Sequence, residues 1–494
     1  MAVLEGVRPA EEKAEAAGRA WSSYAPVAAL VVYAATVAVV IARHEPWFDE
    51  AQAWLIARDS NLLELFPRLA YEGQPGLWHL ILMLPAKLLP YSAIGWISGT
   101  LGVLGVWVLV RWSPFPVWAK VVIPFTYFVF YQYSVVARSY ALLPVLMFAV
   151  ACRYPRRHES PWLFAGSLFL LAASTTSGFL IAGSLLAIAG IEALKASPGS
   201  RLPARREIVA FGATGLAMAA MAFALLPPAD RTFAEDGFQL VGPGELFRVT
   251  FTMLNESLAG WWVVLLPALA ASLTFFHARR VLHLYAVPAT VNLLFFAFVH
   301  RAPWHQGVLF LIWVFAFWVA LGRPEGERAG EPRAVRIRRA ALAMLAVVCL
   351  VQVSWSVRTA ISDVNGSYSG SRELANYLKE NNLEGSKIYA IHWASFALNP
   401  YFERNLFDNY RRPDGISYWD WSEGNTMVEN PDLIEGFRPD LVVFPVKIPG
   451  TEADMAEALP NYRQKAVFWG EMFWKGGVLQ PEVYLLFERL PDVP

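Results

Sequence analysis

The feature of this sequence that most constrains its fold is a series of long apolar segments separated by clusters of basic residues. A membrane-crossing helix needs roughly 20 mainly apolar residues, and Lys and Arg collect in the loops on the cytoplasmic side. Of the 494 residues, 56% are hydrophobic and only 17% are charged, whereas an ordinary soluble domain has about a quarter charged residues. The sequence therefore predicts an α-helical polytopic membrane protein.

The basic clusters order the apolar segments into helical hairpins. We expect five clusters in the cytoplasm: Arg111 with Lys120; Arg153, Arg156 and Arg157; Lys195, Arg201, Arg205 and Arg206; Arg279 with Arg280; and the run from Arg323 to Arg339. Between successive clusters lie paired segments, at 119–135 with 139–152, 161–176 with 178–194, 208–226 with 260–276, and 281–299 with 305–321. With single spans at 24–42, 91–110 and 340–357, this predicts about eleven transmembrane helices in a region covering 24–357. Residues 1–23 would then be cytoplasmic.

One apolar segment is too short to fit this series. Leu77–Leu89 has about 13 residues and contains Pro85 and Lys87, and if it crossed the membrane, every later basic cluster would move outside. We interpret it as an amphipathic helix on the membrane surface. The first outer loop then covers 44–91, and a longer outer loop runs from about Pro227 to Gly260.

The last part of the chain, 358–494, has the composition of a soluble domain outside the cytoplasm. It reads as a small α/β domain with a helix at 371–380 and strands at 387–391, 441–446 and 483–488. Between the strands lies SYWDWSEG, at 417–424. Its aromatic rings and carboxylates suit sugar binding, but aromatic turns also pack the cores of small domains, and both interpretations stay open.

The strongest candidate for chemistry lies in the stretch from His44 to Gly76. Asp49 and Glu50 stand side by side among Trp47, Phe48 and Trp54, where the first span should meet water. A carboxylate held against aromatic surface is partly desolvated, which raises its basicity toward that of a general base. The alternative is that both acids only open an amphipathic helix, where they complement the helix dipole.

Further charges lie near the expected outer face of the membrane. Arg138 falls between two apolar spans, and His300, Arg301 and His305 cluster in FVHRAPWHQGVLF. Ionisable groups at membrane depth are costly and therefore functional candidates. A guanidinium matches the oxygens of a phosphate, and a lipid-borne phosphate would arrive at this depth. The alternative is that these side chains reach lipid headgroups or close internal salt bridges.

Several other classes of function lack their sequence signals. The chain has no phosphate-binding GxxxxGK[ST] loop and no HExxH motif, and its net charge of zero gives no reason to expect a nucleic acid partner. Cys152 and Cys349 lie in or beside apolar segments, so we do not expect a disulfide between them. The histidines at 44, 79, 300 and 305 are scattered, so we predict neither a metal nor another cofactor.

The motifs WFDEAQAW and YEGQPGLWHLIL, followed by a basic outer turn and a terminal outer domain, resemble the polytopic GT-C glycosyltransferases. The likeness is to the bacterial relatives of protein O-mannosyltransferases and of the lipid A aminoarabinose transferase. It implies transfer of one sugar from a polyprenyl-phosphate donor to a glycan, lipid or protein acceptor, at the outer face of the bacterial plasma (inner) membrane. Asp49 would correspond to the catalytic acid residue of the first loop. The sequence departs from that pattern at Gln74-Pro75-Gly76, where a His-Pro-Pro run is common, and at Arg138-Ser139-Tyr140, where a second acid often follows the arginine.

Together, the residues and the resemblance predict an inverting glycosyltransferase. Asp49 would take the proton of the acceptor hydroxyl, and Glu50 would orient Asp49 or the acceptor. Arg138 or Arg301 would stabilise the leaving phosphate. Glu72 would bind a sugar hydroxyl, and the substrate site would also include Tyr140, His300 and His305.

Two other classes of protein remain as alternatives. A lipid-linked sugar transporter or flippase should show discontinuous helices or paired halves, which we do not expect from this sequence. A non-catalytic membrane assembly protein would not need a carboxylate at the border of helix and loop. Convergence of Asp49 with the two arginines would favour the enzyme.

Overall fold

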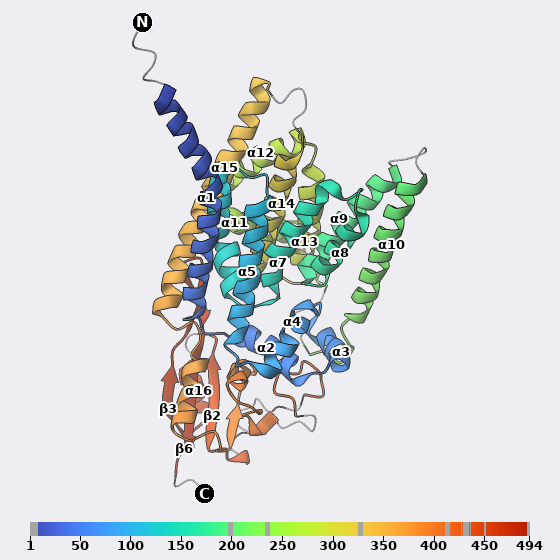
Figure 1. The fold of residues 1–494 in the computed structure, drawn as a ribbon. Helices are drawn as coiled ribbons and strands as arrows, with labels where there is room; N and C mark the ends of the chain where they lie inside the picture. The colour runs from blue at the N-terminus through green and yellow to red at the C-terminus, as the bar shows by residue number, and fades with distance from the viewer. Residues whose placement is uncertain are drawn as a thin grey trace.

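The computed structural model describes residues 8–195, 201–232, 238–324, 330–410, 415–425, 427, 434, 436–448 and 451–491. Parts of the predicted segment 1–23, of the loop 227–260 and of the basic run 323–339 lie outside these residues. The chain is mainly helical, and a small sheet domain stands at one end of the helical region (Figure 1).

The helical region is built from long apolar helices, and every predicted span except 119–135 coincides with one of them. They are α1 Arg8–Ile41, α5 Ala93–Trp112, α7 Leu142–Arg153, α8 Pro161–Ala172, α9 Thr176–Lys195, α10 Arg201–Ala224, α11 Pro243–Leu258, α12 Trp262–Ala278, α13 Leu282–Phe298, α14 Gln306–Gly322 and α15 Pro332–Asn365. Within the described ranges, six helices are long and apolar enough to cross a membrane, or seven if the bent pair α11–α12 is one span. The protein is a polytopic helical membrane protein, while the number of eleven spans stays a prediction.

The centre of the bundle is α14. Every residue from Gln306 to Ala320 is buried in the protein, and the helix lies among α7, α11 and α13 in Figure 1. A helix that is apolar on all sides has to be buried on all sides. By contrast, α10 exposes Leu216 and Phe223 on the outside of the bundle.

The predicted span 119–135 is wrong as a regular helix. The chain there forms α6 Val117–Val122, a 3₁₀ turn at Ile123–Phe125 and a π-helix, η2, at Phe128–Val135. Pro124 has no N–H to continue the first helix, and a π-helix is a rare geometry that often accompanies functional sites. The segment ends just before Arg138.

The predicted loop from Pro227 to Gly260 also needs correction, because it contains α11. The axes of α11 and α12 differ by 86°. The bend lies at Gly260, which adopts φ +72° and donates its N–H to the carbonyl of Asn255. Glu245, Arg248 and Glu256 lower the hydropathy of α11. For this reason the sequence did not predict an apolar helix there.

Three short helices lie at the same end of the long helices as the sheet domain, beside the strands (Figure 1). They are α2 Phe48–Asp59, α3 Leu62–Glu72 and α4 Leu77–Leu88. Asn61 caps α3 by accepting the N–H groups of Leu63 and Glu64, and Gly73 ends that helix at φ +66°, a conformation that favours glycine. The structure thus confirms the short helix expected at 77–89, and α2 and α3 fill the rest of the predicted first outer loop.

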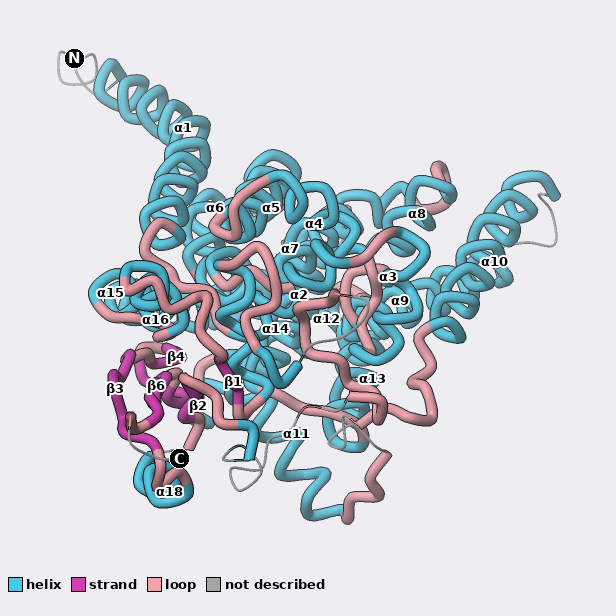
Figure 2. Tube along the Cα trace, turned by 90° about the horizontal axis from the view of Figure 1, so that it is seen from below, coloured by secondary structure: helices cyan, strands magenta, loops and turns pink. Residues whose placement is uncertain are grey.

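The terminal domain is a sheet with helices packed against it, among them α18 Thr451–Ala458, which contacts β3. Its strands are β1 Ile388–Ala390, β2 Leu441–Val446, β3 Tyr462–Phe468 and β6 Val483–Arg489, in the order β1-β2-β6-β3, with only the β1–β2 pair parallel. A hairpin, β4 Glu471–Trp474 with β5 Gly477–Pro481, stands apart. The helix α16, Ser371–Glu380, packs its buried Leu374 and Leu378 against the sheet, and Figure 2 shows the strands gathered beside α15 and α16. The predicted helix and three predicted strands are present, whereas β3, β4 and β5 were not predicted.

The direction in which the chain crosses the membrane can be tested with truncation fusions. An alkaline phosphatase reporter, which folds only outside the cytoplasm, should be active when fused after Asn365 and inactive when fused after Arg205 or Arg336, since short Arg-rich loops stay inside. Activity after Arg205 would reverse the assignment of the outer loops.

Candidate functional site

The site is centred on an ion pair between two residues far apart in the sequence. Asp49 lies in the first turn of α2, and Arg138 follows the π-helix; Asp49 Oδ2 and Arg138 Nη2 are 2.6 Å apart. The Asp49 side chain keeps 27% of its exposure, while that of Arg138 keeps 10%. The carboxylate is therefore reachable from solvent, and the guanidinium is largely enclosed.

Aromatic rings hold the Arg138 guanidinium in place. Its Cζ lies 4.2 Å from the ring centre of Trp304, 5.4 Å from that of Tyr140 and 5.5 Å from that of Trp47. Rings at these distances attract a cation and limit its motion. Arg138 Nη1 and Trp47 Nε1 are buried without a hydrogen-bond partner in the described part of the chain, so two donors beside Asp49 remain available to an oxygen-rich group.

Glu50 ties α2 to the segment that carries Arg138. It is fully buried, and its carboxylate accepts the backbone N–H of Ala137 at 2.7 Å and that of Trp47 at 3.1 Å. The first bond fixes the residue directly before Arg138, and the second fixes the start of α2. No solvent reaches Glu50, and its two bonds are those of a residue that orients its neighbours, which is the role expected for Glu50 from the sequence.

A buried chain of polar groups continues from Glu50 to the last long helix. His44 Nε2 lies 3.3 Å from Glu50, His44 Nδ1 lies 2.8 Å from Asp363 of α15, and the Tyr131 hydroxyl donates to Asp363 at 2.8 Å. Burial disfavours the charged imidazole, but Asp363 and Glu50 outweigh that effect and raise the pKa of His44. A protonated His44 between two carboxylates joins the first outer loop to α15.

The electrostatic surroundings of Asp49 make it a stronger base than an exposed aspartate. Burial raises the pKa of Asp49, although Arg138 and Lys447 oppose that rise. Lys447 comes from the terminal domain, directly after β2, where it pairs with the buried Glu482 and lies 6.0 Å from the ring of Trp47. A carboxylate with a raised pKa that still faces solvent can accept a proton from a bound hydroxyl.

Of the remaining predicted residues, three lie beside the ion pair, and Arg301 and Glu72 lie elsewhere. Tyr140, His300 and His305 lie beside the ion pair: the His305 ring is 5.9 Å from that of Tyr140 and 5.3 Å from that of His300, and the charge of His300 acts on Asp49. His305 is buried, and its Nδ1 accepts the N–H of Ala302. Arg301 is different, since it is 45% exposed and its ion pair is with Glu245 of α11, at 3.3 Å.

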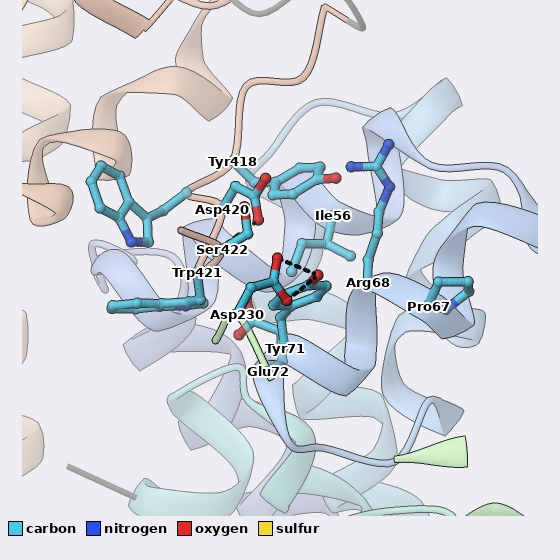
Figure 3. Close-up of a pocket in the computed structure, with 11 residues that line it drawn as sticks. Ile56, Pro67, Arg68, Tyr71, Glu72, Asp230, Tyr418, Asp420, Trp421 and Ser422 are labelled. Atoms are coloured by element: carbon cyan, nitrogen blue, oxygen red, sulfur yellow. Dashed lines mark hydrogen bonds between the residues drawn. The ribbon is translucent and has the colours of Figure 1, made fainter. Parts of the chain in front are cut away.

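Glu72 lies at the edge of a separate pocket. Gln52 of α2 donates to Glu72 at 2.8 Å, and burial raises the pKa of Glu72 to about 7. The pocket has a volume of about 210 Å³ (Figure 3). Its lining comes from three segments: Ile56, Pro67, Arg68, Tyr71 and Glu72 of α2 and α3; Asp230; and Tyr418, Trp419, Asp420, Trp421 and Ser422 of the terminal domain.

Sequence reasoning missed several residues of this site. Lys447 could have been found as the first charged residue after a buried strand, a position where side chains reach the edge of a sheet. Asp363 carried a weaker signal, because a single acid near the end of a long apolar helix is also typical of a surface position. Among the described residues, no group of three or more His, Cys, Asp or Glu is arranged to hold a metal ion.

Comparison with known proteins supports the fold. No protein-family model matches the sequence, and no curated protein matches it significantly. Among solved structures, the chain is similar to ArnT, the lipid A aminoarabinose transferase, from Cupriavidus metallidurans in the apo state. The TM-score is 0.55 at 13% identity, and the match covers 96% of this chain and 98% of that chain. The chain is therefore a polytopic membrane protein with a GT-C-like fold and a soluble terminal domain.

Proposed function

We propose that this protein is an inverting glycosyltransferase that moves a sugar from a polyprenyl-phosphate donor to an acceptor at the outer face of the membrane. The observation that carries the proposal is the solvent-accessible Asp49 carboxylate beside Arg138, which has a buried Nη1 with no partner in the described residues. A base for the acceptor and a cation for the leaving phosphate thus stand side by side. A single displacement at a sugar carbon needs both a base for the attacking hydroxyl and stabilisation of the leaving group.

In the proposed reaction, Asp49 removes the proton from the acceptor hydroxyl as that oxygen attacks the anomeric carbon. The new glycosidic bond forms while the bond from the anomeric carbon to the phosphate oxygen breaks, and the lipid phosphate leaves with the electron pair. Arg138 and the Trp47 indole N–H stabilise its charge. Because attack and departure are in line, the configuration at the sugar carbon inverts.

The ion pair itself suggests how donor binding prepares the base. Arg138 Nη2 lies 2.6 Å from Asp49 Oδ2. A donor phosphate would compete for the guanidinium and free a carboxylate oxygen for the acceptor. Glu50 holds both backbones during this exchange through its bonds to Ala137 and Trp47.

The proposal includes the placement of the chain in a bacterial plasma (inner) membrane. Residues 1–23 would lie in the cytoplasm, 24–357 would form the catalytic membrane region, and 358–494 would lie outside the cytoplasm with the first outer loop. Lys447 supports this arrangement, because it joins the terminal domain to the site at Trp47.

The stereochemistry of the product tests the proposal. Purified protein incubated with a polyprenyl-phosphate sugar and acceptor should give a glycoside whose anomeric configuration, read from its proton coupling constants, is opposite to that of the donor. Retention of configuration would contradict a single displacement with Asp49 as the base.

A transporter of lipid-linked sugars is the second candidate, because the structure has the discontinuous helices that the sequence did not predict. The segment 117–135 is broken, and α11 and α12 are bent. Liposomes with a labelled donor separate the two functions. Movement of the donor between leaflets without any new glycoside would favour transport, whereas a new glycoside would favour transfer.

A further inference from the structure

The pocket next to Glu72 is held together by contacts between segments that are distant in sequence. Thr232 donates its N–H to the carbonyl of Trp421 at 2.8 Å, and Glu423 donates to the carbonyl of Asp230 at 2.8 Å, so the two strands of chain form a short antiparallel bridge. Arg231 also donates to the carbonyl of Tyr71 at 2.7 Å. The pocket is therefore formed jointly by α2 and α3, the segment after α10 and the terminal domain.

The lining of this pocket combines ring faces with carboxylates. Figure 3 shows Tyr418 next to Arg68, whose Cζ lies 5.1 Å from the Tyr418 ring centre, and shows Asp230 accepting from Tyr71. Asp420 and Glu72 add two further carboxylates. Ring faces stack on the C–H faces of a sugar, and carboxylates accept its hydroxyl groups.

Two residues of the lining carry a buried donor. Tyr418 is 3% exposed and Trp419 is 9% exposed, and neither the Tyr418 hydroxyl nor the Trp419 indole N–H has a hydrogen-bond partner in the described residues. Leaving a buried donor without a partner destabilises the protein. The Trp419 ring packs against Phe396 and Tyr410 of the terminal domain, so the Tyr418 hydroxyl is the donor that an oxygen-rich molecule in the pocket would satisfy.

The pocket is connected to Asp49 in two ways. Gln52 lies one helical turn after Asp49, and its side-chain amide bonds both Glu72 and the backbone of Trp419, at 2.7–3.0 Å to the latter. A row of rings also leads from Trp421 to Trp393, 5.9 Å apart, and from Trp393 to Phe48, 4.4 Å apart. Phe48 is the neighbour of Asp49.

From these contacts we infer that the pocket is a subsite for a sugar residue of the acceptor, and that the acceptor is a neutral or amino-bearing glycan. This inference rests on the proposed glycosyltransferase function and specifies its acceptor class. Asp230 and Asp420, together with Glu72, whose pKa of about 7 leaves it partly protonated near neutral pH, outnumber the one guanidinium of the lining, that of Arg68, and so disfavour an anionic acceptor. The rings and the unpaired Tyr418 hydroxyl suit a pyranose. The partly exposed Trp421 ring stacks on the sugar, the Tyr418 hydroxyl donates to it, and the acceptor then extends toward Asp49.

Binding of simple glycosides tests the subsite without any turnover. Saturation-transfer NMR on the purified full chain, with no donor present, would use the methyl glycosides of a neutral hexose, a 2-amino-2-deoxyhexose and a hexuronate. The first two should bind, and the hexuronate should bind at least about tenfold more weakly, because the acidic side chains of the lining outnumber the Arg68 guanidinium.

Variants then locate the binding. Trp421→Ala should raise the dissociation constant about tenfold. Tyr418→Phe, which keeps the ring and removes only the hydroxyl, should raise it about threefold to tenfold. Trp469→Ala is the matched control, since Trp469 belongs to the same domain but is 67% exposed away from the pocket. It should bind like the unmodified chain.

The outcomes separate this inference from the proposed function. Equal binding of the hexuronate, unchanged binding in both pocket variants, or no binding of any glycoside would overturn the subsite. Asp49→Asn should bind the glycosides normally. If transfer depends on Asp49 but the acceptor KM is unchanged in Trp421→Ala and Tyr418→Phe, the proposed function stands and the subsite is rejected. If the pocket binds glycosides but transfer does not depend on Asp49, the subsite stands and the proposed function is rejected.

Discussion

Asp49→Asn should lower sugar transfer by about a hundred- to ten-thousand-fold, which is the range typical of removing a general base. The amide keeps the shape of the side chain but cannot accept the proton of the acceptor hydroxyl. The donor should still bind, because Arg138 and the Trp47 indole N–H remain. Initial rates with a radiolabelled polyprenyl-phosphate sugar, together with donor binding by the same variant, measure both parts of this prediction.

The helix-opening interpretation of Asp49 predicts a different result. Asp49 occupies the first turn of α2, where an acid contributes only about 0.3–1 kcal/mol to stability. Under that interpretation Asp49→Asn would turn over normally. Glu50→Gln is the matched neighbour: it removes one oxygen acceptor from the buried bonds to Ala137 and Trp47, so its thermal unfolding temperature should fall more than that of Asp49→Asn.

The pH dependence of the transfer rate is an independent test of Asp49 as the base. Burial raises the pKa of Asp49 above that of an exposed aspartate, and only the deprotonated carboxylate can take the proton. The rate should therefore fall as pH decreases through that raised pKa, at a higher pH than an exposed carboxylate would give. An acid limb identical in Asp49→Asn would assign the titration to another group.

The sequence predicted the elements of this fold better than their irregularities. Apolar length identified the long helices because lipid and core both require it. It failed at 117–135, where Pro124 and the π-helix interrupt a segment of suitable hydropathy, and at α11, where Glu245, Arg248 and Glu256 hide an amphipathic helix. Hydropathy averages over a window and does not register a local break.

The candidate site was predicted in part for a similar reason. Asp49 and Arg138 were chosen because each is a charge at the border of an apolar segment, and the structure brings them within 2.6 Å. Arg301 carried the same signal, yet it pairs with Glu245. Glu245 belongs to α11, a helix that the sequence pattern did not predict. Lys447 and Asp363 reach the site only through the folding of distant segments, which a single sequence does not reveal.

Arg138→Ala should lower transfer by roughly a hundred- to a thousandfold, the cost of removing one group that stabilises charge in a transition state. Arg138→Lys should also be damaging, because an ammonium cannot reproduce the fork that contacts Asp49 through Nη2 while Nη1 remains for a phosphate oxygen. Both variants should bind the donor more weakly, which single-turnover and binding measurements on the purified protein would show.

A second readout distinguishes loss of the cation from loss of structure. Arg138 lowers the pKa of Asp49 against the effect of burial, so its removal should raise that pKa further and move the acid limb of the rate profile to higher pH. Arg301→Ala is the matched comparison and should cost much less, since Arg301 is 45% exposed and engaged with Glu245. Full turnover in Arg138→Ala with an unmoved acid limb would remove the phosphate role of Arg138, and Arg138 would then be a structural partner of Asp49 alone.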